Sequence, residues 1–163
     1  MSVTNGSQNG ATVSTQAESA FRAFIRAFGL IERAMHGHFQ SFGISGSQWG
    51  ILRNLHRAEE AGENELRLTD LSQRLLIRPP SVTGVVARLE QVGLVLRKST
   101  PDDLRAKRVA LTAKGRALVE RVLTVHGKRI ARLMAALTRG EQEQLTHLLM
   151  RLSDSLEVAA GPE

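Results

Sequence analysis

Two consecutive prolines, Pro79 and Pro80, constrain the fold of this 163-residue chain more than any other feature. Neither proline can donate a backbone hydrogen bond, so a helix that arrives from the N-terminal side has to stop there. Proline suits the first position of a helix, so a new helix can begin at the same place. Leu71 and Leu75 before the break, and a stripe of valines after it, have helical spacing. The sequence therefore predicts two short helices joined by a tight turn.

The second of these helices is predicted to run from Pro80 to Val92 and to end at Gly93, which can adopt the left-handed conformation of a helix cap. Its inward stripe consists of Val82, Val85, Val86, Leu89 and Val92. Two strand-like runs follow at residues 94–98 and 108–111, separated by a polar turn centred on Pro101, Asp102 and Asp103. These runs predict a β-hairpin directly after the helix.

The remaining elements are predicted to be helical. Residues 1–14 are small and polar and predict a disordered tail, and a capping box of Thr15 and Glu18 predicts the start of a long amphipathic helix that Gly43 ends. Four later helices start with the expected caps Ser47, Thr69, Thr112 and the pair Thr138 with Glu141. The predicted fold class is mainly α with a small β-hairpin.

The predicted domain organisation follows from which apolar stripes the central part can cover. Residues 44–112 form the compact central domain, and residues 15–43 and 113–158 form long helices whose stripes are too extensive for that domain to cover alone. Pairing with a second copy of the chain is the economical way to bury them. We therefore expect a two-fold homodimer in which these two regions form the interface.

Charge and composition limit the partners. The chain has a net charge of +6, and residues 67–116 alone carry eleven Lys or Arg against four acids, a local charge of +7. Such a block is typical of a protein that binds a polyanion, although a solvated basic surface is the alternative. The chain has no cysteine, which excludes disulfides, thiolate metal sites and a cysteine nucleophile or redox sensor. We expect no membrane span and no signal peptide, and hence a soluble cytoplasmic protein.

The outward face of the helix after the prolines is short and free of acids in its first two turns. It consists of Ser81, Thr83, Gly84, Ala87, Arg88 and Gln91. A helix enters the major groove of DNA only if the side chains nearest the bases are short, with hydroxyls, amides or an Arg that reach base edges and phosphates. A polar helix surface with no ligand is the other interpretation. The absence of Glu and Lys from these turns favours DNA.

The turn of the hairpin gives a second indication. Asp103 is spaced to hold Arg105 by a charge-assisted hydrogen bond, and an Arg at a hairpin tip can enter a narrow minor groove. A turn made soluble by mixed charges would look the same in isolation. In combination with the helix break and the acid-free helix, it predicts a winged helix-turn-helix.

The central run LTDLSQRLLIRPPSVTGVVARLEQVGLVLRKSTPDDLRAKRVALTAKG, with the upstream run 44–55, resembles the MarR (multiple antibiotic resistance regulator) family. Asp103 and Arg105 match the D-x-R signature of the family's wing, and Val109, Leu111 and Thr112 follow at the family's spacing. The resemblance extends from about Thr15 to the last helix. The double proline at the start of the recognition helix is unusual for the family.

The resemblance implies a dimeric transcriptional regulator that binds a pseudo-palindromic operator in double-stranded DNA, with recognition helices in successive major grooves and wings in the flanking minor grooves. Base and adjacent phosphate contacts are expected from Ser81, Thr83, Gly84 and Arg88, and Arg105, aimed by Asp103, enters the minor groove. The expected phosphate contacts are Arg78, Arg97, Lys98 and Lys107. With roughly 8 neutralised phosphates per dimer, the slope of the logarithm of the binding constant against the logarithm of salt concentration should be about −7.

Family members are commonly repressors that small ligands, often aromatic acids, release from DNA. His36, His38, Phe39 and Trp49 lie where the dimerisation helices are expected to meet the DNA-binding part, and could stack a ring and pair a carboxylate. The alternative is that Phe39 and Trp49 are core residues and the histidines are solvated. His36 and His38, two residues apart, point to different helix faces, so we expect no metal site and no cofactor.

Two other classes of function are weighed against DNA binding. An enzyme is not expected, because the sequence has no phosphate-binding loop, nucleophile elbow, paired carboxylates or metal signature. A winged helix can also serve only for protein contacts, since a fold does not determine function. The acid-poor outward face of the helix argues against that alternative.

Overall fold

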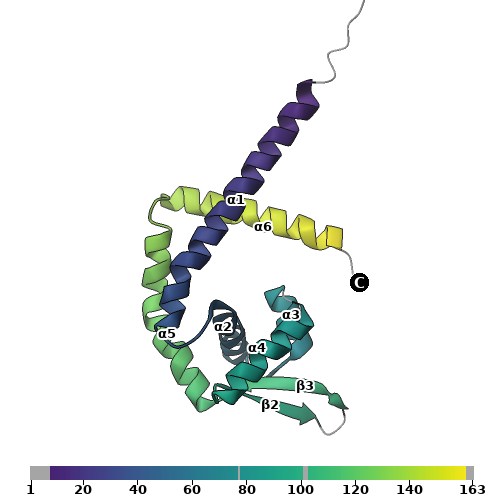
Figure 1. Cartoon of the computed structure of the whole chain (residues 1–163), viewed down its shortest axis with the longest axis vertical. Helices are drawn as coiled ribbons and strands as arrows, with labels where there is room; N and C mark the ends of the chain where they lie inside the picture. The colour runs from purple at the N-terminus through teal and green to yellow at the C-terminus, as the bar shows by residue number, and fades with distance from the viewer. Residues whose placement is uncertain (1–7, 77, 101–102, 161–163) are drawn as a thin grey trace, which may run out of the picture. The chain divides into compact units, whose positions relative to one another are not determined.

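The computed structural model describes residues 8–76, 78–100 and 103–160, with side chains for residues 15–76, 78–98 and 107–159. The chain divides into two compact units, Met1–Arg121 and Val122–Glu163. The elements of the first unit are α1 (Gln8–Gln40), α2 (Gly46–Glu60), β1 (Leu66–Arg67), α3 (Leu68–Leu75), α4 (Pro79–Gln91), β2 (Val95–Thr100), β3 (Asp103–Leu111) and the first part of α5 (Ala113–Leu133) (Figure 1). The second unit contains the rest of α5 and α6 (Arg139–Ala160). This order confirms the predicted mainly α class with a β-hairpin.

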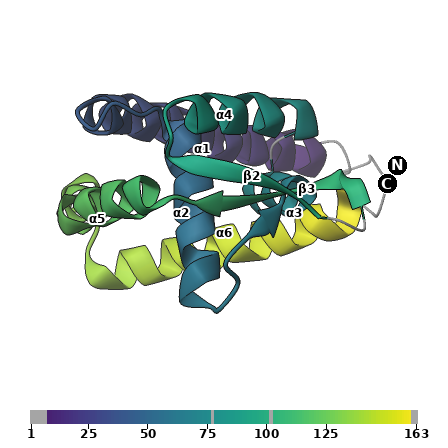
Figure 2. The ribbon, with the colours of Figure 1, turned by 90° about the horizontal axis from the view of Figure 1, so that it is seen from below.

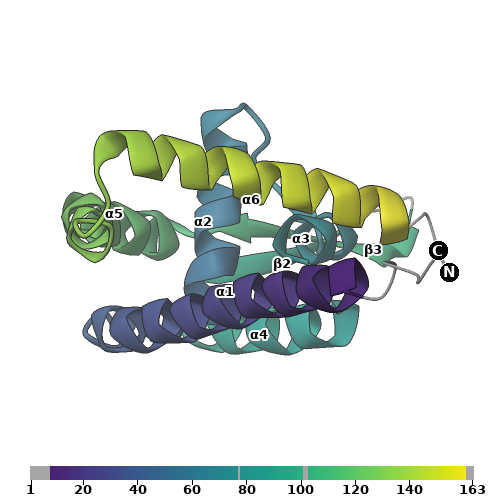
Figure 3. The ribbon, with the colours of Figure 1, turned by 90° about the horizontal axis from the view of Figure 1, so that it is seen from above.

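Three antiparallel strands form a small sheet in the order β1, β3, β2. In the hairpin, Val95 pairs with Leu111 and Lys98 pairs with Arg108, and the register shifts between Ser99 and Thr100. Helix α2 contacts α3, α4 and β3, and it crosses the direction of the strands (Figures 2 and 3). Helix α4 runs alongside β2 (Figure 2). Helices α3 and α4 are therefore supported by α2 and by the sheet.

The core of the first unit is built from the apolar positions that helical spacing predicts. Ile51, Leu52 and Leu55 of α2 are at most 2% exposed, and Leu71 of α3 is fully buried. The sheet adds Leu66, Val95, Val109 and Leu111, each at most 2% exposed. Burying a side chain of this kind contributes about 1.5–3 kcal/mol. The core lies directly under α4 and holds that helix in place.

Two helices end with the predicted glycines. Gly43 and Gly93 have φ of 74° and 73°, in the left-handed region. The amides beyond them, of Ile44 and Leu94, donate to carbonyls five residues back at 3.2 and 2.9 Å. These are the hydrogen bonds of the Schellman motif, which only a residue tolerant of positive φ can close cheaply.

Several helix starts differ from the prediction. Helix α1 begins at Gln8 rather than at Thr15, so the predicted tail is wrong over residues 8–14, and residues 1–7 lie outside the described residues. Once a helix is nucleated, each added residue gains a hydrogen bond, so the helix extends past the internal Thr15 and Glu18 pair. Helix α2 is capped by Ser45 rather than Ser47, because the Ser45 Oγ accepts from the Gln48 amide and the Gln48 side chain accepts from the Ser45 amide.

The third helix and the sheet also differ. Arg67, not Thr69, precedes the first turn of α3, and its amide donates to the Asp70 carboxylate at 3.1 Å. Strand β1 was not predicted, and β2 and β3 are longer than the predicted runs. Val92 was expected to face inward, but it is 49% exposed because α4 ends one residue before it.

Predicted caps of the last two helices are confirmed. The Thr112 hydroxyl accepts from the Gly115 amide at 3.0 Å at the start of α5. In the second unit, the Thr138 amide donates to the Glu141 carboxylate at 2.7 Å, and the Glu141 amide donates to the Thr138 hydroxyl at 3.4 Å. The hydrogen bonds from the Thr138 amide and hydroxyl hold the pKa of Glu141 below its ordinary value.

The two compact units meet at Arg121, within α5, and the predicted domain boundaries, which rest on function, stay a prediction. The first unit includes α1 and the start of α5. The end of α1 joins it because Met35 and Phe39 are buried and α1 contacts α2. The predicted dimerisation role of residues 15–43 and 113–158 is a separate matter and stays a prediction.

Candidate nucleic-acid interface

Helix α4 separates apolar and polar residues onto two faces. Arg78 precedes its first turn, and Pro79 and Pro80 occupy the first two positions, so the helix begins one residue before the predicted start at Pro80. The inward face is the stripe Val82, Val85, Val86 and Leu89, all at most 8% exposed. The surface of the helix that remains outside therefore belongs to the short polar residues between these positions.

The predicted base-reading residues lie on that outside face. Ser81, Thr83 and Arg88 are exposed, and Gly84 is partly exposed. The Thr83 hydroxyl donates to the Pro79 carbonyl at 3.1 Å, and its oxygen can still accept a hydrogen bond. No acid of α4 lies in its first three turns, and Glu90, near the C-terminus, is its only carboxylate.

Two cations of this helix are available for a ligand. The side chains of Arg78 and Arg88 are exposed and have no hydrogen bond or ion pair with any residue that the structure describes. Unpaired guanidinium groups are suited to phosphate oxygens or to the acceptor edge of guanine. The helix thus offers cations at both ends of a small neutral surface.

The predicted wing residues differ in whether another side chain of the protein pairs with them. Lys107 is exposed, whereas Lys98 lies 3.4 Å from the Glu65 carboxylate, which also approaches Arg108 at 3.6 Å. Asp103 and Arg105 belong to β3, but their side chains lie outside the described residues. The charge-assisted hydrogen bond between Asp103 and Arg105 therefore stays a prediction.

Arg97 has a partner that the sequence did not reveal. Its Nε donates to a Glu90 carboxylate oxygen at 2.6 Å, and its backbone amide donates to the other oxygen at 3.2 Å. These hydrogen bonds lower the pKa of Glu90 against an opposing effect of burial. The structure thus pairs Arg97 within the protein, although a phosphate contact was expected.

The predicted effector residues lie on the end of α1 and the start of α2. Phe39 and Trp49 stack with ring centroids 5.7 Å apart and are 6% and 7% exposed, so they are core residues. His38 lies against the rings of Phe39 and Phe42, and His36 is exposed on α1. This arrangement agrees with the core interpretation of the two large aromatic residues.

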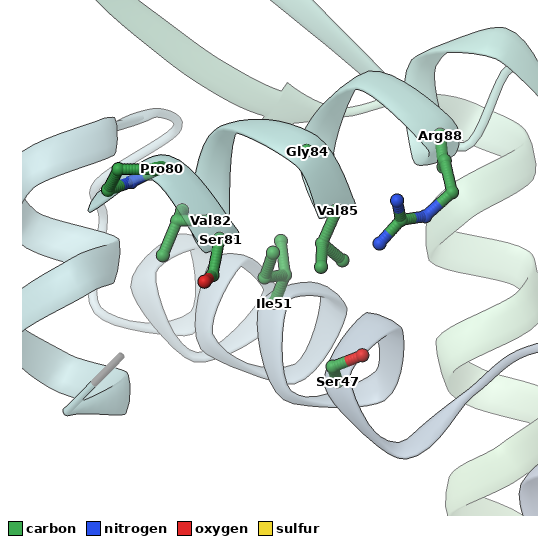
Figure 4. Close-up of a pocket in the computed structure, with 8 residues that line it drawn as sticks. All are labelled: Ser47, Ile51, Pro80, Ser81, Val82, Gly84, Val85 and Arg88. Atoms are coloured by element: carbon green, nitrogen blue, oxygen red, sulfur yellow. The ribbon is translucent and has the colours of Figure 1, made fainter. Parts of the chain in front are cut away.

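A pocket of about 390 Å³ lies instead between α2 and α4. Ser47 and Ile51 line it from α2, and Ser81, Val85 and Arg88 are among its residues from α4 (Figure 4). The guanidinium of Arg88 points toward the pocket (Figure 4). Sequence reasoning missed this pocket because its two walls come from helices some thirty residues apart, and no local spacing brings them together.

Two kinds of feature are absent from residues 8–76, 78–100 and 103–160. No helix among them is both long enough and apolar enough to pass through a membrane. No three His, Cys, Asp or Glu side chains among the same residues come together in a way that could hold a metal ion.

Helices α3 and α4, joined by a tight turn and followed by the β2–β3 hairpin, define a winged helix-turn-helix. A model of the MarR family matches residues 42–106. The homoprotocatechuate degradative operon repressor of Escherichia coli is 36% identical over 106 residues, covering 65% of this chain and 68% of that protein. The chain belongs to the MarR family of transcriptional regulators, and so to a class of regulators, not enzymes.

Two solved structures share the fold. A mutant MarR of Escherichia coli complexed with operator DNA has a TM-score of 0.76 at 22% identity, covering 84% of this chain and 95% of that chain. BpsR of Bordetella bronchiseptica, whose DNA binding is regulated by 6-hydroxynicotinic acid, has a TM-score of 0.75 at 23% identity, covering 83% of this chain and 98% of that chain. At these identities the likeness is evidence for the fold alone.

Proposed function

We propose that the chain is a homodimeric regulator that binds a pseudo-palindromic operator through α4 and the β2–β3 wing. The observation that carries this proposal is the division of α4 into a buried valine face and an exposed, acid-free face of small residues with two unpaired arginines. A face of this kind fits the major groove, where short side chains allow the helix backbone to approach the bases.

Each predicted contact has a role in this proposal. Ser81, Thr83, Gly84 and Arg88 face bases or adjacent phosphates. Arg105, aimed by Asp103, enters the flanking minor groove, and Arg78, Lys98 and Lys107 contact phosphates. The mutant MarR that shares this fold was solved with operator DNA, which supports the placement by analogy. DNA binding to a bacterial chromosome implies a cytoplasmic protein.

Exposed apolar side chains support the homodimer. Helix α1 exposes six large apolar residues by 43–64%, and α6 exposes a row of leucines by 36–60%. These residues are Phe21, Phe24, Ile25, Phe28, Leu30 and Ile31 on α1 and Leu145, Leu148, Leu152 and Leu156 on α6. Exposed apolar rows of this kind, on each helix by itself, mark an interaction surface. A second copy of the chain, related by a two-fold axis, is the occupant that a pseudo-palindromic operator requires.

The test is binding to duplex DNA from the region that flanks the gene, measured by fluorescence anisotropy against a scrambled duplex of equal length. Arg88→Ala should weaken binding to the specific duplex by about 1–3 kcal/mol, because it removes a base or phosphate contact. Arg139→Ala, an exposed arginine of α6 in the second unit, is the matched control and should leave affinity unchanged. A chain that serves only for protein contacts would bind both duplexes equally weakly.

We further propose that the regulator is a repressor that a small aromatic acid releases. The similar Escherichia coli protein is a repressor of a degradative operon, and 6-hydroxynicotinic acid regulates DNA binding by BpsR. The pocket between α2 and α4 has the matching chemistry: apolar walls at Ile51 and Val85, and the Arg88 guanidinium for a carboxylate. Since Ser81 and Arg88 line this pocket and also face DNA in the proposal, ligand and operator would compete for them.

This second proposal can be tested with 6-hydroxynicotinic acid and 6-hydroxynicotinamide, a pair of probes that differ only in the carboxylate. The acid should lower operator affinity and the amide should not. Ser47→Phe should abolish the response while preserving DNA binding, because Ser47 is exposed and lines only the α2 side of the pocket. An undiminished response of Ser47→Phe would place the effector elsewhere.

A further inference from the structure

A single tight turn connects the recognition helix to the wing. Helix α4 ends at Gln91 and β2 begins at Val95. Gly93, with φ of 73°, closes the turn, and the Leu94 amide donates to the Leu89 carbonyl at 2.9 Å. Only residues 92–94 therefore separate the recognition helix from the first strand of the wing.

The start of α5 holds the same turn from the other side. The Thr112 hydroxyl donates to the Gly93 carbonyl at 2.7 Å, and the Lys114 Nζ donates to the Val92 carbonyl at 2.7 Å. These bonds fix the backbone of the turn. At the start of β2, Val95 is buried and pairs with Leu111. A side-chain contact further along β2 ties the strand to α4 directly.

The side chains of Glu90 and Arg97 make that contact. Glu90 is in the last turn of α4, and Arg97 is the third residue of β2. The carboxylate accepts from the Arg97 Nε at 2.6 Å and from its backbone amide at 3.2 Å, and the Nη2 lies 2.5 Å away. Both side chains are about one-third exposed, so the pair is less screened by water than an ordinary surface ion pair.

We propose that Glu90 and Arg97 form a positioning pair that fixes the angle between the recognition helix and the wing, so that both can enter their grooves at once. This inference rests on the proposed DNA-binding function. Arg97 acts through Glu90 and contacts no phosphate. The dimer then has six phosphate contacts, from Arg78, Lys98 and Lys107 of each protomer, and the expected log–log salt slope is about −5 rather than −7.

The direction in which Glu90→Gln changes operator affinity distinguishes a positioning role from an effect of charge alone. Glu90→Gln keeps the shape of the side chain but removes a negative charge close to the DNA-binding surface. If only charge mattered, operator binding would become tighter, because a repulsion with phosphate is lost. If the pair positions the wing, binding becomes weaker by about tenfold, the effect of weakening a charge-assisted hydrogen bond.

The experiment measures operator affinity by fluorescence anisotropy over a range of salt concentrations, with a hydroxyl-radical footprint of each complex. Glu90→Gln and Arg97→Gln should each weaken binding about tenfold, with no further loss in the double variant and no change in salt slope. The footprint should lose protection of the sugars that line the flanking minor grooves and keep protection of the backbone on either side of the central major grooves. Lys107→Gln is the matched control and should reduce the salt slope by about 2 per dimer.

Replacing Arg97 with lysine distinguishes the positioning role from a phosphate contact, which general destabilisation of the fold could not do. Arg97→Lys keeps the charge but cannot donate from an Nε, so it should behave like Arg97→Gln; a phosphate contact would tolerate the lysine. Equal or tighter binding by Glu90→Gln, or a reduced salt slope for Arg97→Gln, would overturn the positioning role while leaving specific binding by the wild-type chain intact. If the wild-type chain shows no sequence preference, the proposed function and this role fail together.

Discussion

Replacing Gly115 with alanine should destabilise the chain strongly, and the reason is steric. A Cβ at this position of α5 would lie 2.1 Å from the Leu94 carbonyl oxygen and 3.2 Å from the Leu111 side chain. Ordinary contact begins at 3.4 Å, so the backbones would have to move apart by about 1.3 Å. The obstacle is backbone, which cannot swing away as a long side chain does.

The magnitude follows from what this movement disturbs. Overpacking a tight contact costs about 1–3 kcal/mol. The Leu94 carbonyl also accepts from the Thr112 amide at 3.1 Å, and losing that bond adds about 1 kcal/mol. The free energy of unfolding should therefore fall by about 2–4 kcal/mol, which lowers Tm by about 4–16 °C for a chain of this length.

Urea unfolding followed by circular dichroism measures this change, at one fixed protein concentration because a dimer's stability depends on concentration. Gly127→Ala in the same helix is the matched control: a Cβ there meets nothing within 4 Å, so the alanine should raise helix stability by up to about 1 kcal/mol. A Gly115→Ala variant within about 0.5 kcal/mol of the wild type would refute the steric reasoning.

Three further variants test other parts of the molecule. Arg105→Ala should weaken operator binding by about 1–3 kcal/mol without lowering Tm, and unchanged affinity in a titration would remove its assigned role. Phe39→Ala should lower the free energy of unfolding in urea by about 3–5 kcal/mol, because the ring is buried against Trp49; a fully stable variant would show that the ring is not core. Because the pKa of Glu141 is lowered in the folded chain, its contribution is fully present above the ordinary pKa of 4.5 and is lost as the pH falls through the lower pKa of the folded state. Thermal stability should thus decline more steeply below about pH 5 in the wild type than in Glu141→Gln, and parallel profiles would contradict this.

The parts of the fold that could be predicted from the sequence are those set by local chemistry. Pro79 and Pro80 break the chain whatever surrounds them, and Gly43 and Gly93 supply conformations that other residues avoid. Ser45 is also predictable from local chemistry as the cap of α2, because Gln48 follows at the capping-box spacing, whereas the predicted cap Ser47 has Gly50 at that position. Strand β1 has two residues, too short for any alternation to show, and it forms because β3 offers a free edge.

The parts of the candidate site that could not be predicted depend on contacts between distant elements. The outward residues of α4 followed from helical spacing, because the buried stripe determines the opposite face. Arg97 looked like a phosphate contact because spacing says nothing about whether Glu90, across a turn, reaches it. The pocket between α2 and α4 could not be predicted either, because its lining residues come from two helices that are distant in the sequence.

The central claim is that the exposed face of α4, with the wing, reads duplex DNA as a two-fold pair. Selection of the full-length protein's preferred sites from a pool of random duplexes tests it most directly. The account predicts an enriched pseudo-palindrome whose half-sites lie about one helical turn apart, roughly 10 base pairs, and predicts that Arg88→Ala relaxes the preference within each half-site. A pool that shows no enriched motif, or a motif without two-fold symmetry, would contradict it.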